Sequence, residues 1–268
     1  MDIEWILAYL MLGAVVGFMA GLLGIGGGGI MVPILTALFA AQGVAQEHLV
    51  HMALGTSMAS IVVTAYSSLR AHHRHQAVLW PVVWKITPSI LIGTLLATWV
   101  AALLPTTVLG IFFSCFMAYV ALQMILNIKP KPSRQLPGTV GISLAGLSIG
   151  GISAMVAIGG GSLTVAFLTW CNVRIQQAIG TSAAVGMPIA LAGSIGYMIN
   201  GWGASNTPDY SVGYVYFPAV ILISVVSFFT APVGASLAHK LPVGTLKKVF
   251  AGLLILLSLK MLQTIFMG

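Results

Sequence analysis

Two short glycine-rich stretches carry the residues of this chain that are best suited to bind a ligand. The first comprises Gly26, Gly27, Gly28 and Gly29, and the second comprises Gly159, Gly160, Gly161 and Ser162. Glycine lowers helix stability, so such a run within apolar sequence favours a break between two helical pieces. A new helix start exposes backbone N–H groups and partial positive charge, which favour anions. We therefore predict that both stretches bind an anion; the alternative is that their glycines only permit close helix packing.

A threonine–serine pair follows each glycine-rich stretch. Thr56 and Ser57 come after the first stretch, and Thr181 and Ser182 come after the second. We expect these pairs to begin or interrupt the next helices and to add hydroxyl donors to the same site. The alternative is that each hydroxyl bonds back to its own helix.

These matches belong to an ordered series that indicates an internal duplication. Gly26 and Gly159 are 133 residues apart, and GIGGGG (24–29) corresponds to AIGGGS (157–162). Leu104-Pro105 and Leu241-Pro242 then open similar last segments, in which Met124 corresponds to Met261. The sequence therefore predicts two repeats, residues 1–130 and 131–268, within one integral membrane domain.

The composition excludes an ordinary soluble domain. The chain is 59% hydrophobic and 6% charged, with a mean hydropathy of +1.04, whereas soluble domains carry roughly 25% charged residues. The net charge of +7 comes from basic residues between apolar segments, a distribution typical of membrane proteins rather than of a nucleic-acid partner. Asp2 and Glu4 argue against a cleaved signal peptide, so we expect the first helix to stay. Cys115 and Cys171 lie in apolar runs and should be buried, and we predict no metal site and no cofactor.

Apolar segments of the length that a membrane crossing needs define an all-α polytopic fold. The expected segments are 5–23, 28–41, 51–69, 79–103, 108–127, 138–157, 160–172, 175–200, 213–238 and 245–267. Segments 28–41 and 160–172 are short, and each follows a glycine-rich stretch. Each repeat is thus predicted to be a glycine-broken helical hairpin plus three transmembrane helices, giving about 8–10 membrane segments.

The charges of the links predict how the segments run through the membrane. Basic links after Ser68, from Ile128 to Pro137, at Arg174 and near Lys247 should be cytoplasmic. The acidic residues Asp2, Glu4, Glu47 and Asp209 should then all be external. This arrangement places both termini outside and makes the two repeats run oppositely, as in transporters whose substrate lies between inverted repeats. We predict a bacterial cytoplasmic (inner) membrane protein.

Ionisable residues within the segments point to the class of substrate. None of the ten segments has an Asp or Glu in its interior, which disfavours a cation carrier and favours an anion. Lys260, opposite Gln123 in the duplication, is a candidate for charge or coupling, but could instead extend to the membrane surface. His51 could titrate near neutral pH, but could instead have a capping or interfacial role.

Three histidines, His72, His73 and His75, are close enough in sequence to suggest a metal site. They alternate with Arg70 and Arg74, so a basic cytoplasmic loop is the better interpretation.

The doubled motif resembles a known family. GIGGGGIMVPIL (24–35) with LGTSMAS (54–60), repeated as AIGGGSLTVAFL (157–168) with IGTSAAV (179–185), is similar to the sulfite exporter TauE/SafE family, also described as toluene-sulfonate uptake permeases. The resemblance covers nearly the whole chain and implies a polytopic transporter of sulfite, sulfonates, sulfoacetate or related anions. One departure is that Pro33 of the first motif has Ala166 at the corresponding position, which leaves open whether the two half-sites contribute equally.

The sequence therefore predicts a secondary transporter that moves a small sulfur-containing anion by alternating access, with the anion held between the two glycine-rich breaks. A passive anion channel, and less favourably a metal-cation permease, remain alternatives. The chain shows no Ser-His-Asp, His-Glu-x-x-His or paired-carboxylate pattern inside the membrane, so we do not expect an enzyme. The expected partners are the small anion, the lipid bilayer and, as one option, a second copy in a homodimer.

Overall fold

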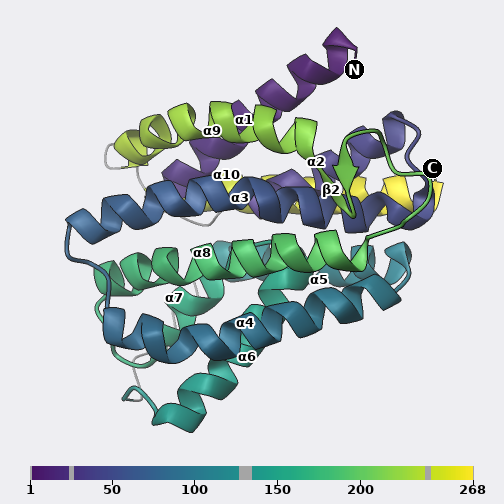
Figure 1. Ribbon diagram of the computed structural model, residues 1–268. Coiled ribbons are helices and arrows are strands. Elements are labelled where there is room, and N and C mark those ends of the chain that lie inside the picture. The colour runs from purple at the N-terminus through teal and green to yellow at the C-terminus, as the bar shows by residue number, and fades with distance from the viewer. Residues whose placement is uncertain (1, 24–26, 127–134, 239–242, 268) are drawn as a thin grey trace.

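Helices make up almost all of the structure. The computed structural model describes residues 2–23, 27–126, 135–238 and 243–267 (Figure 1). Its helices are α1 (Ile3–Leu23), α2 (Gly28–Ala41), η1 (Gln46–His48), α3 (Leu49–Arg74), α4 (Trp80–Leu103), α5 (Thr106–Ile125), α6 (Thr139–Val156), α7 (Gly161–Trp170), α8 (Ile175–Asn200), α9 (Phe217–Ala238) and α10 (Val243–Met267). Within the described residues, eight helices are long and apolar enough to cross a membrane, and α2 and α7 are shorter. The predicted all-α polytopic membrane fold is confirmed.

Two segment boundaries differ from the prediction by more than two residues. The predicted basic loop after Ser68 is wrong, because α3 continues to Arg74 and carries these basic residues on its last turns. Residues 213–216 do not begin a helix either; β1 (Ser211–Val212) and β2 (Val215–Tyr216) form an antiparallel hairpin ahead of α9. Hydropathy marks the length of an apolar run but not the conformation of the residues at its two ends, which explains both errors.

The centre of the bundle is formed by α3 and α8, which lie against each other (Figure 1). The side chain of Met58 packs on Gly193, whereas Gly55 lies beside Tyr197, so α3 and α8 run antiparallel. Both glycine-rich stretches lie against the middle of α3, because Gly28 and Gly159 each approach the side chain of Ile61. The central helices therefore form part of the surroundings of both glycine-rich stretches.

The outer helices pack on partners from the other half of the chain. α1 lies along α9, and α6 lies along α4 (Figure 1). Gly13 and Gly17 of α1 touch the backbone of α9, and Gly146 and Gly150 of α6 touch the backbone of α4. Each pair has the spacing of four residues that permits close approach of membrane helices. Helices of the two predicted repeats are thereby interleaved rather than separated.

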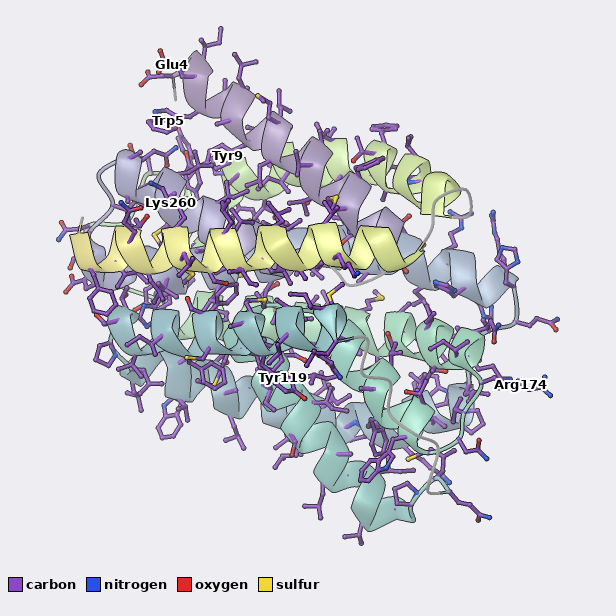
Figure 2. All side chains as sticks on the ribbon, turned by 180° about the vertical axis from the view of Figure 1, so that it is seen from behind. Glu4, Trp5, Tyr9, Tyr119, Arg174 and Lys260 are labelled. Carbon is purple, nitrogen blue, oxygen red and sulfur yellow. The ribbon has the colours of Figure 1, made fainter. Side chains whose placement is uncertain are left out.

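Charged residues collect at the two ends of the bundle. Figure 2 shows Glu4, Trp5 and Lys260 toward one end and Arg174 at the opposite end. We call the end with Glu4 and Glu47 the acidic end, and the end with Arg74 and Arg174 the basic end. At the acidic end the β-hairpin is inserted among the helices, with Tyr216 contacting the rings of Tyr9 and Phe39.

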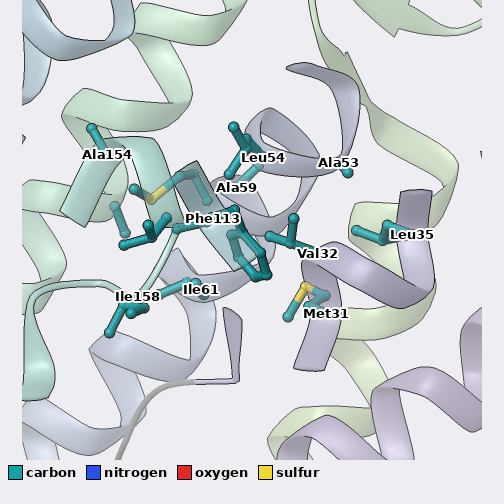
Figure 3. Packing of buried hydrophobic residues seen from close by; sticks show 14 of the residues in the cluster. Met31, Val32, Leu35, Ala53, Leu54, Ala59, Ile61, Phe113, Ala154 and Ile158 are labelled. Atoms are coloured by element: carbon teal, nitrogen blue, oxygen red, sulfur yellow. The ribbon is translucent and has the colours of Figure 1, made fainter. Parts of the chain in front are cut away.

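The apolar core runs through the middle of the bundle, and Figure 3 shows part of it around Phe113. Cys171 is buried, as predicted, but the prediction for Cys115 is wrong, because this side chain is exposed on α5. An apolar segment of a membrane protein has a face toward lipid, so apolar surroundings in sequence do not imply burial.

Candidate substrate cavity between the glycine breaks

The two glycine-rich breaks touch each other. A Cβ atom on Gly28 would overlap the carbonyl oxygen of Ala157, so only glycine allows the start of α2 to approach the end of α6 this closely. Ile61 of α3 lies against both breaks, with its Cγ2 atom 3.1 Å from the position of a Cβ on Gly159. The structure thus brings together the two stretches that the sequence predicted to face each other.

The second break has an irregular backbone. Helix α6 ends at Val156, and the next residue, Ala157, is left-handed with φ 48°. Helix α7 begins after Gly160, which has a φ of 72°. No side chain caps the start of α7 by a hydrogen bond. The first N–H groups of a helix have no acceptor within that helix, so this start offers donors and partial positive charge to a ligand.

A cavity of about 410 Å³ leads from the basic end to this break. Its walls come from the last turns of α1 and α9, the second half of α3, the α6–α7 break and the first half of α8. The lining residues are Ala20, Gly21, Ile61, Thr64, Ala65, Ser67, Ser68, His72, Ile158, Gly159, Gly161, Ile179, Ser182, Ala183, Gly186, Ala231 and Pro232. Figure 3 shows Ile61 and Ile158 side by side at its inner end.

The lining of the cavity is neutral and rich in small residues and hydroxyls. No Asp, Glu, Lys or Arg is among the described residues that line it, and His72 is the ionisable group. His72 lies near the end of α3, beside Arg70 and Arg74 on the same helix. A path of this kind offers hydrogen-bond donors without an acidic group and opens at the end of the bundle that carries Arg70 and Arg74, which suits a small anion better than a metal ion.

Some of the predicted site glycines line the cavity, and others pack against neighbouring helices. Gly159 and Gly161 line the cavity. Gly27 and Gly29 are packed instead, against Val16 and against Leu254 with Met117, respectively. Gly26 lies outside the described residues.

The two threonines make equivalent hydrogen bonds to the other half of the chain. The Oγ1 atom of Thr56 accepts the backbone N–H of Tyr216, just before α9, at 3.0 Å. The Oγ1 atom of Thr181 accepts the backbone N–H of Leu79, just before α4, at 2.9 Å. Both threonines are fully buried within continuous helices, so the expectation that they begin or interrupt helices is wrong. Their substrate-binding role stays a prediction.

The two serines of these pairs have different environments. Ser182 lines the cavity, whereas the hydroxyl of Ser57 is fully buried and has no hydrogen-bond partner within the described part of the chain. Residues that the sequence analysis did not single out share this property at the second break: Ser153 and Thr164 are fully buried without a partner, and both approach Gly160. Nothing in the sequence motif distinguishes these hydroxyls, because only packing shows that they lack partners.

The candidate charge and coupling residues lie away from the cavity. Lys260 is exposed on α10 toward the acidic end, and Gln123 is half-buried on α5 (Figure 2). His51 is buried, with its Nε2 atom 3.0 Å from the carbonyl oxygen of Ala101 and its Nδ1 atom 3.4 Å from the hydroxyl of Thr106. It therefore connects α3 to the end of α4 and the start of α5.

The predicted histidine cluster does not form a metal site in the structure. His73 accepts a hydrogen bond from the indole of Trp80 at 3.3 Å, and His72 faces the cavity. Within the described ranges, no group of three His, Cys, Asp or Glu side chains is arranged to hold a metal ion.

Comparison with known proteins places the chain among membrane transporters. A family model described as "Sulfite exporter TauE/SafE" matches residues 9–261. A probable membrane transporter protein of Haemophilus influenzae is 40% identical over 96% of this chain and 98% of its own length. The probable membrane transporter protein YdhB of Bacillus subtilis is 25% identical over 94% of this chain and 98% of its own. No solved structure gives a significant match.

Proposed function

The chain belongs to the sulfite exporter TauE/SafE family of membrane transporters, and from this premise we propose that it carries a small sulfur-containing anion across a bacterial cytoplasmic membrane. Sulfite, a sulfonate or sulfoacetate would suit the site. The observation that carries the proposal is the cavity that leads from the basic end to the uncapped start of α7 without an acidic side chain in its lining.

Binding of the anion would rest on neutral donors. We place it at the inner end of the cavity, between Gly159, Gly161 and the hydroxyl of Ser182. Backbone N–H groups and hydroxyls can surround the oxygens of a sulfur oxyanion without a positively charged side chain. The basic residues of α3 near the entrance, Arg70 and Arg74, would raise the local concentration of anions.

The anion would cross the membrane by a relative movement of the two repeats, whose corresponding helices pack on each other. The antiparallel pairs α3 with α8 and α5 with α10 join corresponding helices of the two predicted repeats, which supports inverted repeats. With the basic end cytoplasmic, the structure corresponds to an inward-open state. The acidic end, with both termini, would then be external. Rocking of one repeat against the other would close this cavity and open one on the opposite side.

Transport into proteoliposomes tests the proposal. Purified protein should take up radiolabelled sulfite saturably and exchange it in counterflow. Ser182→Ala should raise the KM about tenfold, because one hydrogen bond to a charged ligand is lost. The matched control is Ser148→Ala, a serine on the exposed face of α6 whose hydroxyl bonds to its own helix.

Two results would overturn the proposal. Non-saturable flux without counterflow would indicate a passive anion channel. A thermal-shift panel that responds to a divalent cation but to none of sulfite, sulfate, thiosulfate, sulfoacetate and taurine would exclude the substrate class, since a ligand of the folded state raises its melting temperature.

A further inference from the structure

We propose, building on the transport function above, that Ser57, Thr94 and Ser153 line a second half of the transport path, closed in this structure, and donate hydrogen bonds to the oxygens of the anion when that half opens at the acidic end. These residues would be the external counterpart of the cavity described above.

The first argument is their unpartnered burial. All three side chains are 0% exposed, and their hydroxyl oxygens have no hydrogen-bond partner within the residues that the structure describes. Buried polar groups in folded proteins are nearly always hydrogen-bonded, so a group of unpartnered hydroxyls calls for an explanation. A site that is closed in one state and filled by water or ligand in another provides it.

The second argument is the position of these hydroxyls in the duplication. Corresponding residues are 133 apart in the glycine-rich hairpins, 125 apart from Thr56 to Thr181, and 137 apart from Leu104 to Leu241. Applied to three residues that line the open cavity, these offsets pair Ser182 with Ser57, Ala231 with Thr94 and Ala20 with Ser153.

The two halves carry different side chains at two of these positions. The open cavity has alanine at residues 20 and 231, where the closed half has Ser153 and Thr94. Each of these hydroxyls approaches α6 or the break that follows it: Ser153 lies 3.7 Å from the position of a Cβ on Gly160, and Thr94 lies 2.9 Å from that of Gly150. These two hydroxyls of the closed half thus lie along α6, from Gly150 to the second break.

A hydrogen bond closes this half. The hydroxyl of Tyr197 on α8 donates to the carbonyl oxygen of Ala154 at the end of α6, at 3.0 Å. Tyr197 is fully buried, and at the offset of 125 residues it corresponds to His72, which lies at the entrance of the open cavity. Opening at the acidic end would therefore break this bond and expose Ser153 beside it.

Cysteine accessibility tests the proposed opening. In a background with Cys115→Ala and Cys171→Ala, single replacements Ser57→Cys, Thr94→Cys and Ser153→Cys are exposed to a membrane-impermeant thiol reagent from the external side. We expect all three cysteines to react with the reagent. Their reaction rates should rise about tenfold after Tyr197→Phe and should fall in saturating sulfite. Ser182→Cys should react from the cytoplasmic side, and Thr36→Cys, on a buried helix face outside both cavities, should not react.

Alanine and valine replacements give an independent test that does not need a reactive cysteine. Ser153→Ala and Thr94→Val remove unpartnered hydroxyls, so the melting temperature should stay equal or rise. Transport of sulfite should nevertheless show about a tenfold higher KM from the external side. Ser148→Ala on α6 should change neither quantity.

The outcomes separate this inference from the proposed function. Sulfite transport by the cysteine-free protein, with all three cysteines unreactive from outside, would overturn the inference and leave the transport function standing. A lowered melting temperature for Ser153→Ala would likewise contradict it, because the hydroxyl would then be structural. Reactive cysteines without transport of any sulfur anion would support the opening and overturn the substrate class.

Discussion

The carbonyl oxygen of Ala157 lies directly against the Cα of Gly28, so the two halves of the chain meet at their glycine breaks. The contact involves backbone on both sides, and neither partner can move away by changing a rotamer. Gly28→Ala should therefore lower the free energy of unfolding by about 1–3 kcal/mol, the usual cost of overpacking. Thermal unfolding in detergent measures the effect.

The control for Gly28 is a glycine with open surroundings. Gly252 lies on the exposed side of α10, and a Cβ there would meet no atom within 4 Å. Gly252→Ala should be neutral or stabilise by up to about 1 kcal/mol through helix propensity. Equal behaviour of the two variants would contradict the close contact.

The buried residues Thr56 and Thr181 should stabilise the fold, because each hydrogen-bonds to the other half of the chain. Thr56→Val removes the hydrogen bond from the N–H of Tyr216, and Thr181→Val removes the one from the N–H of Leu79. We expect each to lower the free energy of unfolding by about 1–3 kcal/mol, and serine at either position to recover most of the loss. Thermal unfolding measures this, and sulfite affinity measured on the same samples reports separately whether these threonines bind substrate.

Replacing Ala157 by glycine should make the folded protein more stable. Its φ of 48° lies in the left-handed region, which costs an L-residue about 1–2 kcal/mol. Ala157→Gly should recover part of this free energy and raise the melting temperature, even though glycine also makes the unfolded chain more flexible. A lower melting temperature would mean that the methyl group contributes packing that outweighs the strain.

Alkaline pH should destabilise the acidic end. Burial, and then the charge of Glu47, raises the pKa of Tyr214; burial, and then Asp209, raises the pKa of Tyr216. Because the folded state favours the neutral phenols, their contribution to stability is complete below the unfolded pKa of about 10 and is lost as the pH rises above it. Melting temperatures from about pH 8 to about pH 11 should fall, and Tyr214→Phe should reduce the fall.

A neighbouring tyrosine provides the control for this pH dependence. Tyr210 is exposed, so Tyr210→Phe should leave the alkaline profile unchanged. If the melting temperatures of the wild type and of Tyr214→Phe fell equally with pH, burial of the Tyr214 phenol would not be the cause of the alkaline destabilisation.

Much of the helical organisation could be predicted from hydropathy. The limits expected for residues 28–41 and 175–200 agree with α2 and α8, because glycine-rich or polar residues end the apolar runs there. The end of α3 could not be predicted in this way, since Arg70 and Arg74 are compatible with a helix as well as a loop. Gly13, Gly17, Gly146 and Gly150 were also missed, although their repeated spacing of four residues was a usable signal.

The sequence alone determined that this is an all-helical membrane protein of the TauE/SafE family with a duplicated glycine motif, because composition and motif order are properties of the chain itself. Only the tertiary structure decided which motif residues meet a cavity and which are packed. Ser182 and Ser57 occupy the same place in their motifs, yet Ser182 lines a cavity and Ser57 is enclosed, with no hydrogen-bond partner among the residues that the structure describes. The difference arises from the packing around each serine, because a cavity reaches Ser182 whereas Ser57 is fully enclosed, and no local pattern encodes that choice.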